Sequence, residues 1–351
     1  MKEPAIVLER NPSWGGLVDN FVVDGFRFDN GPHLSFTNNQ YVKGLFAESS
    51  TYHSYFPEPW NYYAGVWIKH PAQNNLFPLS ISEKVRIISE FVNVKAELPS
   101  INNYEEWLRY QYGDYFAERF PMRYTRKIWT VEPRDLTTSW IDARMYRPSL
   151  EEMLRGALTD ETPNTYYAKE MRYPTEGGYK AFVSKMARDV EIRLNAEVTA
   201  IDPFEQKVRL ADGRIEPYSE LISTLPLPEV VKLLPQVPID VLQAADSLMH
   251  TSVALISIGL KNPPPTKSLW SYIYDEEMPA CRVHYPHLKS SNNVPIGKGS
   301  MQFEVYFGKH KPLKIELDAL REQVIKMAAH MKLLELSEIE VVHVKAIPYA
   351  S

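Results

Sequence analysis

The sequence predicts an α/β (α+β) protein in which three parts of the chain have different secondary-structure patterns. Three observations support this fold class. A short, continuously apolar run at residues 5–9 is typical of an interior strand of a parallel sheet. Helical patterns broken by prolines fill about residues 40–170. Alternating apolar segments after residue 250 indicate an antiparallel sheet, and a long amphipathic pattern near the end indicates a helix that covers it.

The composition is that of an ordinary folded protein. The 351 residues, 44% of them hydrophobic and 24% charged, suffice for two or three domains. A net charge of −5 favours no nucleic-acid partner. The single cysteine, Cys281, excludes an internal disulfide and fits a reducing compartment, so we expect a cytoplasmic protein. No apolar run approaches the ~18 residues of a membrane-spanning helix.

The first predicted elements are a strand and a hairpin. The strand at 5–9 ends in Glu9, and we expect it to be buried on both faces. Two alternating runs then meet at Asp24-Gly25, a favourable hairpin turn. The hairpin ends in Gly31-Pro32-His33.

Helices are predicted for the middle of the chain. Ser82 is the expected N-cap of a helix over 82–95, and Asn103 caps another over 103–120. Pro148-Ser149 opens a third. The first of these helices is expected to bury one apolar face: Val85, Ile88, Phe91 and Val92.

The remaining elements follow a turn at 173–178. We expect helices over 179–189, 241–249 and 313–334. The predicted strands are 192–195, 196–201, 207–210, 220–224, 252–260, 270–274, 300–307 and 339–346.

Glu9 is the first candidate for a functional role. In a dinucleotide-binding βαβ unit, an acid at the end of the second strand binds the adenosine ribose about 20 residues after a Gly-rich phosphate turn. That turn would precede Met1, so we expect the chain to begin inside such a unit. Taken alone, a strand that ends in Glu is more often only a solvated strand end.

Three ordered pieces carry a resemblance to a known family. They are Val7-Leu8-Glu9-Arg10, Gly15-Gly16 and Phe28 to His33. Together they resemble the run after the Gly-rich turn in flavoproteins of the amine oxidase, protoporphyrinogen oxidase and UDP-galactopyranose mutase superfamily. The resemblance implies FAD as cofactor and places His33 beside the flavin ring, although a loop histidine satisfied by backbone is the alternative. The residues it assigns to cofactor binding here are Glu9, Arg10, Gly15, Gly16, Gly31, Pro32 and His33.

Two later segments resemble the same superfamily. Residues 172–179 are similar to its Tyr-Pro-x-x-Gly-Gly turn, and 192–198 to the strand whose valine backbone meets adenine. Residues 221–226 are similar to the strand and turn that re-enter the flavin domain. The resemblance therefore adds Gly177, Gly178, Val198, Thr224 and Pro226 to the expected cofactor contacts. Without it, the glycines indicate only a helix-opening turn and the valine only core.

The middle of the chain resembles the UDP-galactopyranose mutase branch. The similar segments are 103–108 and Tyr124 to Trp129, followed by Arg144, but Ile128 replaces the glutamine of the mutases. The resemblance implies that Tyr124, Trp129 and Arg144 lie in the substrate site. An arginine fork suits phosphate or carboxylate, and a tryptophan offers a flat face to a ring. Core aromatics and a salt-bridged arginine are the alternative.

A second group of candidates lies on the predicted sheet. Trp270, Tyr272 and Tyr274 alternate along one strand, so one face would wall a pocket, with Arg282 as an anion clamp. Simple sheet packing is the other interpretation. Cys281 has no patterned histidine partner and is expected to be structural, and no histidine spacing predicts a metal site.

The sequence thus predicts an incomplete Rossmann-like FAD-binding domain (1–45 and 174–235), a helical insertion or cap (46–173) and an antiparallel substrate-binding sheet with its helix (236–351). The expected function is an FAD-dependent oxidoreductase acting on a small molecule. One alternative is a mutase-type isomerase, in which reduced flavin attacks the anomeric carbon of a sugar nucleotide. Another is a partial copy that binds without catalysis, because the resemblance implies further segments before Met1 and after Ser351. Sugar nucleotides, polyprenyl or glycan precursors and porphyrin-like ligands all remain open.

Overall fold

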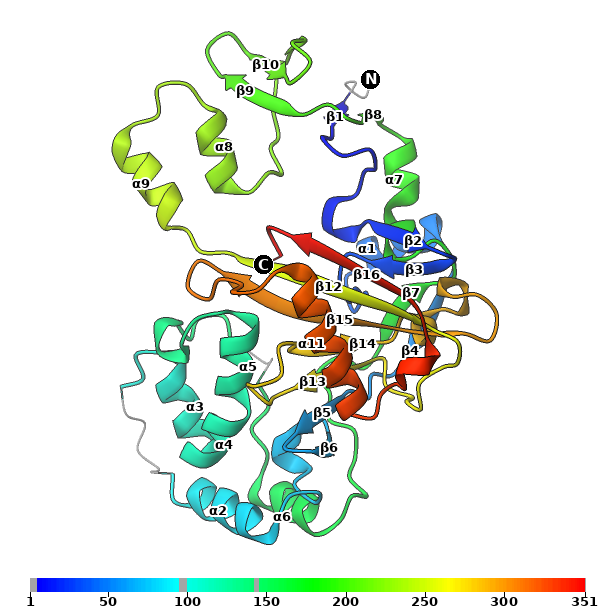
Figure 1. Ribbon diagram of the computed structural model, residues 1–351. Coiled ribbons are helices and arrows are strands. Elements are labelled where there is room, and N and C mark those ends of the chain that lie inside the picture. Colours follow the sequence, from blue (N-terminus) through cyan, green and yellow to red (C-terminus); the bar gives the residue numbers. More distant parts are fainter. Residues whose placement is uncertain (1–4, 95–99, 142–144, 351) are drawn as a thin grey trace.

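A mixed seven-stranded sheet forms the centre of the protein (Figure 1). The computed structural model describes residues 5–94, 100–141 and 145–350. The strand order is β16-β12-β15-β14-β13-β5-β6, and every neighbouring pair is antiparallel except β13 and β5. The strands span Trp60–Tyr63 (β5), Val66–Lys69 (β6), Thr251–Leu260 (β12), Trp270–Ile273 (β13), Arg282–His284 (β14), Gly299–Gly308 (β15) and Ile339–Ile347 (β16). The sheet predicted from four alternating segments is confirmed, and two strands from the middle of the chain extend it.

One face of this sheet is apolar and packs against α11 (Leu317–His330). The predicted covering helix is therefore confirmed, although it is shorter at both ends than expected. Alternate residues of each strand point to this face because side chains in a strand alternate between the two sides. They include Ala254, Ile256 and Ile258 of β12 and Met301, Phe303 and Val305 of β15.

The other face of the sheet carries the β2–β3 hairpin (Asn20–Val23 and Phe26–Asp29). The predicted turn is confirmed, since Asp24 and Gly25 have φ of 48° and 85°. Phe26 and Phe28 are buried against Val341 of β16. The ring of Phe26 also lies over Gly259, where an added Cβ would come within 2.9 Å of three ring atoms. This close contact fixes the end of the hairpin over the sheet.

A helical region beside the sheet shares an aromatic core with β5, β6 and Tyr274. Its helices are α2 (Ile81–Val92), α3 (Tyr104–Tyr112), α4 (Asp114–Arg119), α5 (Pro121–Ile128) and α6 (Leu150–Leu158). Asn103 and Ser149 cap α3 and α6 as predicted. The single helix predicted over 103–120 is wrong, because Gly113, with φ of 81°, breaks it into α3 and α4.

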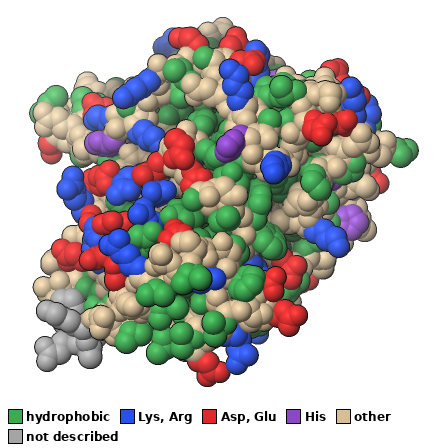
Figure 2. Space-filling model, turned by 60° about the horizontal axis from the view of Figure 1, so that its bottom comes forward, with side chains coloured by type: hydrophobic (Ala, Val, Ile, Leu, Met, Phe, Trp, Pro, Cys, Tyr) green, Lys and Arg blue, Asp and Glu red, His purple; other side chains and the backbone are tan. Residues whose placement is uncertain are grey.

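Two predictions for α2 are also wrong. Its N-cap is Ser80, not Ser82, because Ser80 and Glu83 form a capping box. The second is wrong only in part: Phe91 is buried and Ile88 is partly buried against the helical core, but Val85 and Val92 are exposed and Ile87 is buried instead. Hydrophobic side chains gather on the surface of this region, over α2 and α6 (Figure 2).

The third part surrounds β1 (Ile6–Leu8), which pairs in parallel with β8 (Glu191–Arg193). The parallel pairing agrees with the predicted strand, but burial on both faces is wrong: Ile6 and Val7 are 46% and 43% exposed, because among the described residues β1 has a neighbour on one side only. The strand predicted at 220–224 is absent. Ile222 there is 88% exposed, and this segment pairs with no strand of the described chain.

The remaining elements connect these parts. They are α1 (Gln40–Ser49), β4 (Tyr52–Tyr55) paired with β7 (Met171–Pro174), a 3-10 turn at Tyr179–Val183 leading into α7 (Ser184–Arg188), the sheet of β9 (Val198–Asp202), β10 (Lys207–Leu210) and β11 (Ile215–Pro217), α8 (Leu227–Leu233), α9 (Ile239–Ser247) and α10 (Pro286–Lys289). Among the residues that the structure describes, no helix is both long and apolar enough to cross a bilayer.

The contact between Phe26 and Gly259 gives a stability prediction. Gly259→Ala places a methyl group against a buried ring. We expect overpacking to lower the free energy of unfolding by about 1–3 kcal/mol. Chemical denaturation measures this change.

Gly44→Ala is the matched control, because this glycine lies inside α1 and an added Cβ meets no atom within 4 Å. A helix-interior Gly→Ala change is expected to stabilise by about 0.5–1 kcal/mol. If Gly259→Ala were as stable as the wild type, the hairpin would not be held by this contact.

Candidate active site

A polar stripe crosses the sheet face opposite α11. Cross-strand register aligns Tyr272 with Arg282 and Arg282 with Glu304, and in a second row Trp270 with His284 and His284 with Gln302. These residues alternate with the apolar positions that face α11, so one strand geometry supplies both the core and a polar surface.

The strongest interaction in this stripe is the ion pair of Arg282 and Glu304. The guanidinium donates through Nε and Nη2 to the two carboxylate oxygens. Glu304 is only 1% exposed and also accepts a hydrogen bond from the Tyr306 hydroxyl at 3.2 Å. A buried carboxylate is stable only when paired in this way. The two hydrogen bonds to Glu304 leave Arg282 Nη1 without a hydrogen bond to a described residue, and Arg282 lines a pocket.

The second row connects the sheet to the end of the β2–β3 hairpin. Gln302 Nε2 donates to Ser257 Oγ at 2.9 Å and to the backbone oxygen of Asp29 at 3.1 Å. Its Oε1 must then accept from His284 Nε2, 2.6 Å away. Burial lowers the pKa of His284 far below its ordinary value, so the ring is neutral. The proton therefore sits on Nε2, and Nδ1 is an acceptor without a partner.

Hydrogen bonds of Asp29, Asn20 and Asn30 hold the glycine loops close to one another. Its carboxylate accepts from the Tyr173 hydroxyl at 2.6 Å and from the Tyr179 backbone N–H at 3.0 Å. The Asn20 side chain donates to Gly177 O and the Asn30 side chain to Gly16 O, both at 2.9 Å. The Gly15-Gly16, Gly31-Pro32-His33 and Gly177-Gly178 segments thus converge on one hairpin.

Gly178 has to be glycine at this junction. Its φ is 73°, and an added Cβ would lie 2.7 Å from both Asn20 Nδ2 and Asp29 Oδ1. Gly16, with φ of 55°, has no atom within 4 Å of such a Cβ, so its backbone is open to an approaching group.

His33 lies at the edge of this convergence. Its Nδ1 is 3.1 Å from Gly31 O, and its ring centroid is 5.1 Å from that of Tyr179. Burial lowers the pKa of His33, while Asp29 opposes the shift. The backbone contact and the place beside the glycine loops are both present, and its proximity to flavin stays a prediction.

A pocket of about 160 Å³ lies between the Gly31-Pro32-His33 loop and the polar stripe. Trp270 and Tyr272 wall it as predicted, whereas Tyr274 packs in the helical core against Phe120. The lining consists of Pro32, Leu34, Phe36, Tyr166, Tyr167, Met171, Trp270, Tyr272, Arg282, His284 and Lys289.

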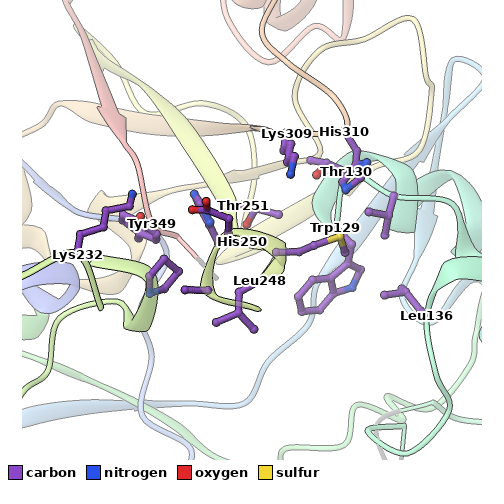
Figure 3. Close-up of a pocket in the computed structure, with 15 residues that line it drawn as sticks. Trp129, Thr130, Leu136, Lys232, Leu248, His250, Thr251, Lys309, His310 and Tyr349 are labelled. Atoms are coloured by element: carbon purple, nitrogen blue, oxygen red, sulfur yellow. The ribbon is translucent and has the colours of Figure 1, made fainter. Parts of the chain in front are cut away.

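The three candidates from the middle of the chain are separated. Tyr124 packs edge-on against Tyr272, with ring centroids 5.2 Å apart, and burial raises its pKa while the charge of Arg282 opposes the rise. Trp129 instead lines a second, larger pocket of about 330 Å³ with Lys232, His250, Lys309, His310 and Tyr349 (Figure 3). Arg144 lies outside the described residues. The structure therefore brings Tyr124, but not Trp129, towards Arg282.

The predicted adenosine contacts form a separate group near β1. Glu9 Oε1 accepts two hydrogen bonds from Asn11, and Glu9 O accepts from Ala196 N, which brings Val198 near. Thr224 and Pro226 lie in the irregular segment before α8, and Glu229 of α8 interacts with Arg10. Their roles in cofactor binding stay predictions.

Neither a cysteine nucleophile nor a metal site is supported by the described residues. Cys281 is buried, and burial raises the pKa of its thiol to about 12, so a thiolate nucleophile is not available at neutral pH. Within the described part of the chain, no cluster of three or more His, Cys, Asp or Glu side chains is arranged to hold a metal ion.

Sequence reasoning missed four residues that the structure places here: His284, Lys289, Gln302 and Glu304. Gln302 and Glu304 did leave a signal, because they interrupt an apolar strand at alternate positions and so share one face. Lys289 left none, since it ends an ordinary short helical turn.

The fold and the convergent glycine loops define a flavin-dependent oxidoreductase fold. The model of the family "Flavin containing amine oxidoreductase" matches residues 4–296, so the chain belongs to this family. The resemblance stated from the sequence is confirmed.

Solved structures agree with this placement. Reduced UDP-galactopyranose mutase is 26% identical with a TM-score of 0.89, and the match covers 98% of this chain and 77% of that one. A protein described as a protoporphyrinogen oxidase from Exiguobacterium sp. 255-15 is 17% identical with a TM-score of 0.72, covering 99% and 82% of the two chains. Putrescine oxidase bound to putrescine is 16% identical with a TM-score of 0.61, covering 96% and 78%. The last two likenesses show the fold alone.

The ion pair in the stripe gives a prediction about stability. Arg282→Met leaves the Glu304 carboxylate buried without its partner and is expected to cost about 3–5 kcal/mol. Glu304→Gln is expected to cost less, because the Arg282 guanidinium borders the pocket. Urea denaturation of both variants measures the difference.

The double variant Arg282→Met/Glu304→Leu serves as the control. Removing both charges is expected to recover most of the stability lost in Arg282→Met, because no buried charge is then left unpaired. Additive losses would contradict the coupling of the two side chains.

Proposed function

We propose that this protein binds FAD and that the flavin oxidises a small molecule held in the pocket between Pro32 and Arg282. The observation that carries the proposal is the position of this pocket. It opens between the Gly31-Pro32-His33 loop, where the family resemblance puts the flavin ring, and a polar stripe with a buried ion pair. Family membership supports the flavin, which when bound supplies the hydride or electron chemistry.

The residues present fit the cofactor. The backbone of Gly16 is open, and Gly178 packs so tightly that the loop keeps its shape. These loops would hold the flavin side of the cofactor, and the segment from Glu9 to Val198 would hold the adenosine side. The neutral His33 would contact the ring without adding a charge beside it.

The protein's own residues have separable tasks in this proposal. The aromatic walls exclude water, since Tyr166 packs edge-on against Trp270 and Tyr272 lines the same pocket. Arg282 is held by Glu304 in one orientation, and its Nη1 would be free to donate to a substrate in the pocket that Arg282 lines. An arginine fixed in this way orients an anionic or carbonyl oxygen with little loss of side-chain freedom.

A mutase-type isomerase acting on a sugar nucleotide is the second candidate. The likeness to UDP-galactopyranose mutase favours it, as does the contact of Tyr124 with Tyr272 near Arg282. Two features count against it: Ile128 replaces the mutase glutamine, and Arg282 has committed two nitrogens to Glu304. Two assays separate the candidates. Isomerisation of a sugar nucleotide in the presence of chemically reduced flavin would support the mutase, and reduction of oxidised flavin by a substrate would support the oxidoreductase.

Flavin binding is the first test. The chain is purified as it stands and also behind an added N-terminal βα unit, and FAD is titrated while its fluorescence and visible absorption are followed. We expect bound flavin, and we expect Gly178→Ala to weaken binding at least tenfold (about 1.4 kcal/mol) because its methyl group displaces Asn20 and Asp29.

Gly213→Ala is the matched control. Gly213 also has a positive φ, 88°, but an added Cβ there meets no atom within 4 Å. Its flavin affinity should equal that of the wild type. A folded protein that takes up no flavin in either form would overturn the proposal.

A further inference from the structure

Lys289 is a buried amine without a partner. Its side chain is 1% exposed, and Nζ forms neither a hydrogen bond nor an ion pair with any described residue. The Tyr173 ring lies beside it, with its centroid 5.3 Å from Nζ. Removing an ammonium group from water is costly, and proteins rarely keep one in this state unless a partner arrives.

The amine borders the same pocket as Arg282. Two more buried polar atoms of the pocket lining lack partners: Trp270 Nε1, a donor, and His284 Nδ1, an acceptor. Arg282 adds Nη1. Buried polar atoms are almost always hydrogen-bonded in folded proteins, so several unpartnered ones around a single cavity indicate a ligand that completes them.

The charges around the pocket restrict that ligand. Lys289 and Arg282 supply two positive groups, while Asp29 and Glu304 stand behind the lining and are already hydrogen-bonded. A single negative charge would balance the unpaired amine. A doubly charged group would be repelled by the two carboxylates.

The remaining walls are apolar and mainly aromatic: Leu34, Phe36, Tyr166, Tyr167, Met171, Trp270 and Tyr272. Flat rings pack well against such walls. A volume of about 160 Å³ is below the roughly 300–1,000 Å³ of pockets that enclose drug-sized ligands. The pocket therefore suits a small molecule with one flat apolar part.

We propose that this pocket binds a small monocarboxylic acid with a flat apolar body, its carboxylate lying between Lys289 Nζ and Arg282 Nη1. Such a carboxylate accepts one charge-assisted hydrogen bond from each cation. The inference rests on the proposed function only in making this acid the substrate of the flavin. Binding of the acid itself requires no flavin.

The test uses benzoate as the probe and isothermal titration calorimetry on the purified chain. Benzoate should bind at least tenfold more tightly than benzamide, its neutral counterpart, and more tightly than phenyl phosphate, which carries a second charge. Equal binding of benzamide, or tighter binding of phenyl phosphate, would overturn the assignment of a monocarboxylate.

Variants assign the binding to Lys289. Lys289→Met removes an unpaired buried charge with little change in shape, so it should fold and lose at least tenfold in benzoate affinity. Lys232→Met is the matched control, because Lys232 lines the other pocket and is paired with Glu229 at the surface (Figure 3). Unchanged affinity in a folded Lys289→Met protein, or an equal loss in Lys232→Met, would overturn the proposal.

The pH dependence provides a second readout. Burial lowers the pKa of Lys289 to about 8, with Asp29 and Glu304 opposing the shift and Arg282 adding to it. His33 and His284, which also face the amine, are held neutral by burial. Benzoate affinity should therefore be constant between about pH 6 and about pH 8, where the probe is a carboxylate, and fall up to tenfold per pH unit above that, whereas in Lys289→Arg it should stay flat. A flat profile in the wild type would contradict a role for this amine.

Flavin titration of the same samples separates the two proposals. If benzoate binds and flavin does not, the acid site stands and the flavin function fails. If flavin binds and benzoate does not, the flavin function stands and the acid site is overturned.

Discussion

The ion pair of Arg282 and Glu304 organises the site because it lies at the centre of a sheet whose two faces have opposite character. On the α11 face every second residue is apolar. On the other face Glu304 is as deeply buried as the core, so it requires a cation on the neighbouring strand, and the register supplies Arg282 directly opposite. Burying two charges is favourable only with this bidentate geometry. The pair thereby determines where the sheet is polar and where a pocket can form beside it.

Asp29 connects the polar face of the sheet to the glycine loops through hydrogen bonds. Its backbone oxygen receives Gln302, and its carboxylate receives Tyr173 and Tyr179, which belong to segments about 150 residues further along the chain. The hairpin can approach the sheet this closely because Gly259 leaves room for Phe26. A small residue on one strand therefore positions the loops on which the proposed flavin site depends.

Sequence reasoning recovered what local pattern determines. The alternation of β12 and β15, the Asp24-Gly25 turn and the caps Asn103 and Ser149 all depend on neighbours in sequence. Sequence reasoning failed for features that depend on contacts between distant parts of the chain. The apolar runs at 5–9 and 220–224 predicted buried strands, but burial requires partner strands that the described chain does not place there. Lys289 and His284 become pocket residues only because the fold brings β14 and α10 against the Gly31-Pro32-His33 loop. No local sequence pattern predicts this contact.

The smaller pocket is the better candidate for a ligand site because of its polar atoms, although the other pocket is larger. The larger one contains Trp129, Lys232, Lys309 and two histidines, and it resembles a binding site by volume and charge (Figure 3). None of the buried unpartnered side-chain atoms found in the described residues belongs to its lining, whereas three of them, on Trp270, His284 and Lys289, belong to the smaller pocket. A surface lysine is satisfied by water and costs nothing to keep, but an unpartnered buried one destabilises the free protein. A ligand in the smaller pocket would therefore stabilise the protein by pairing polar atoms that the folded chain leaves unpaired.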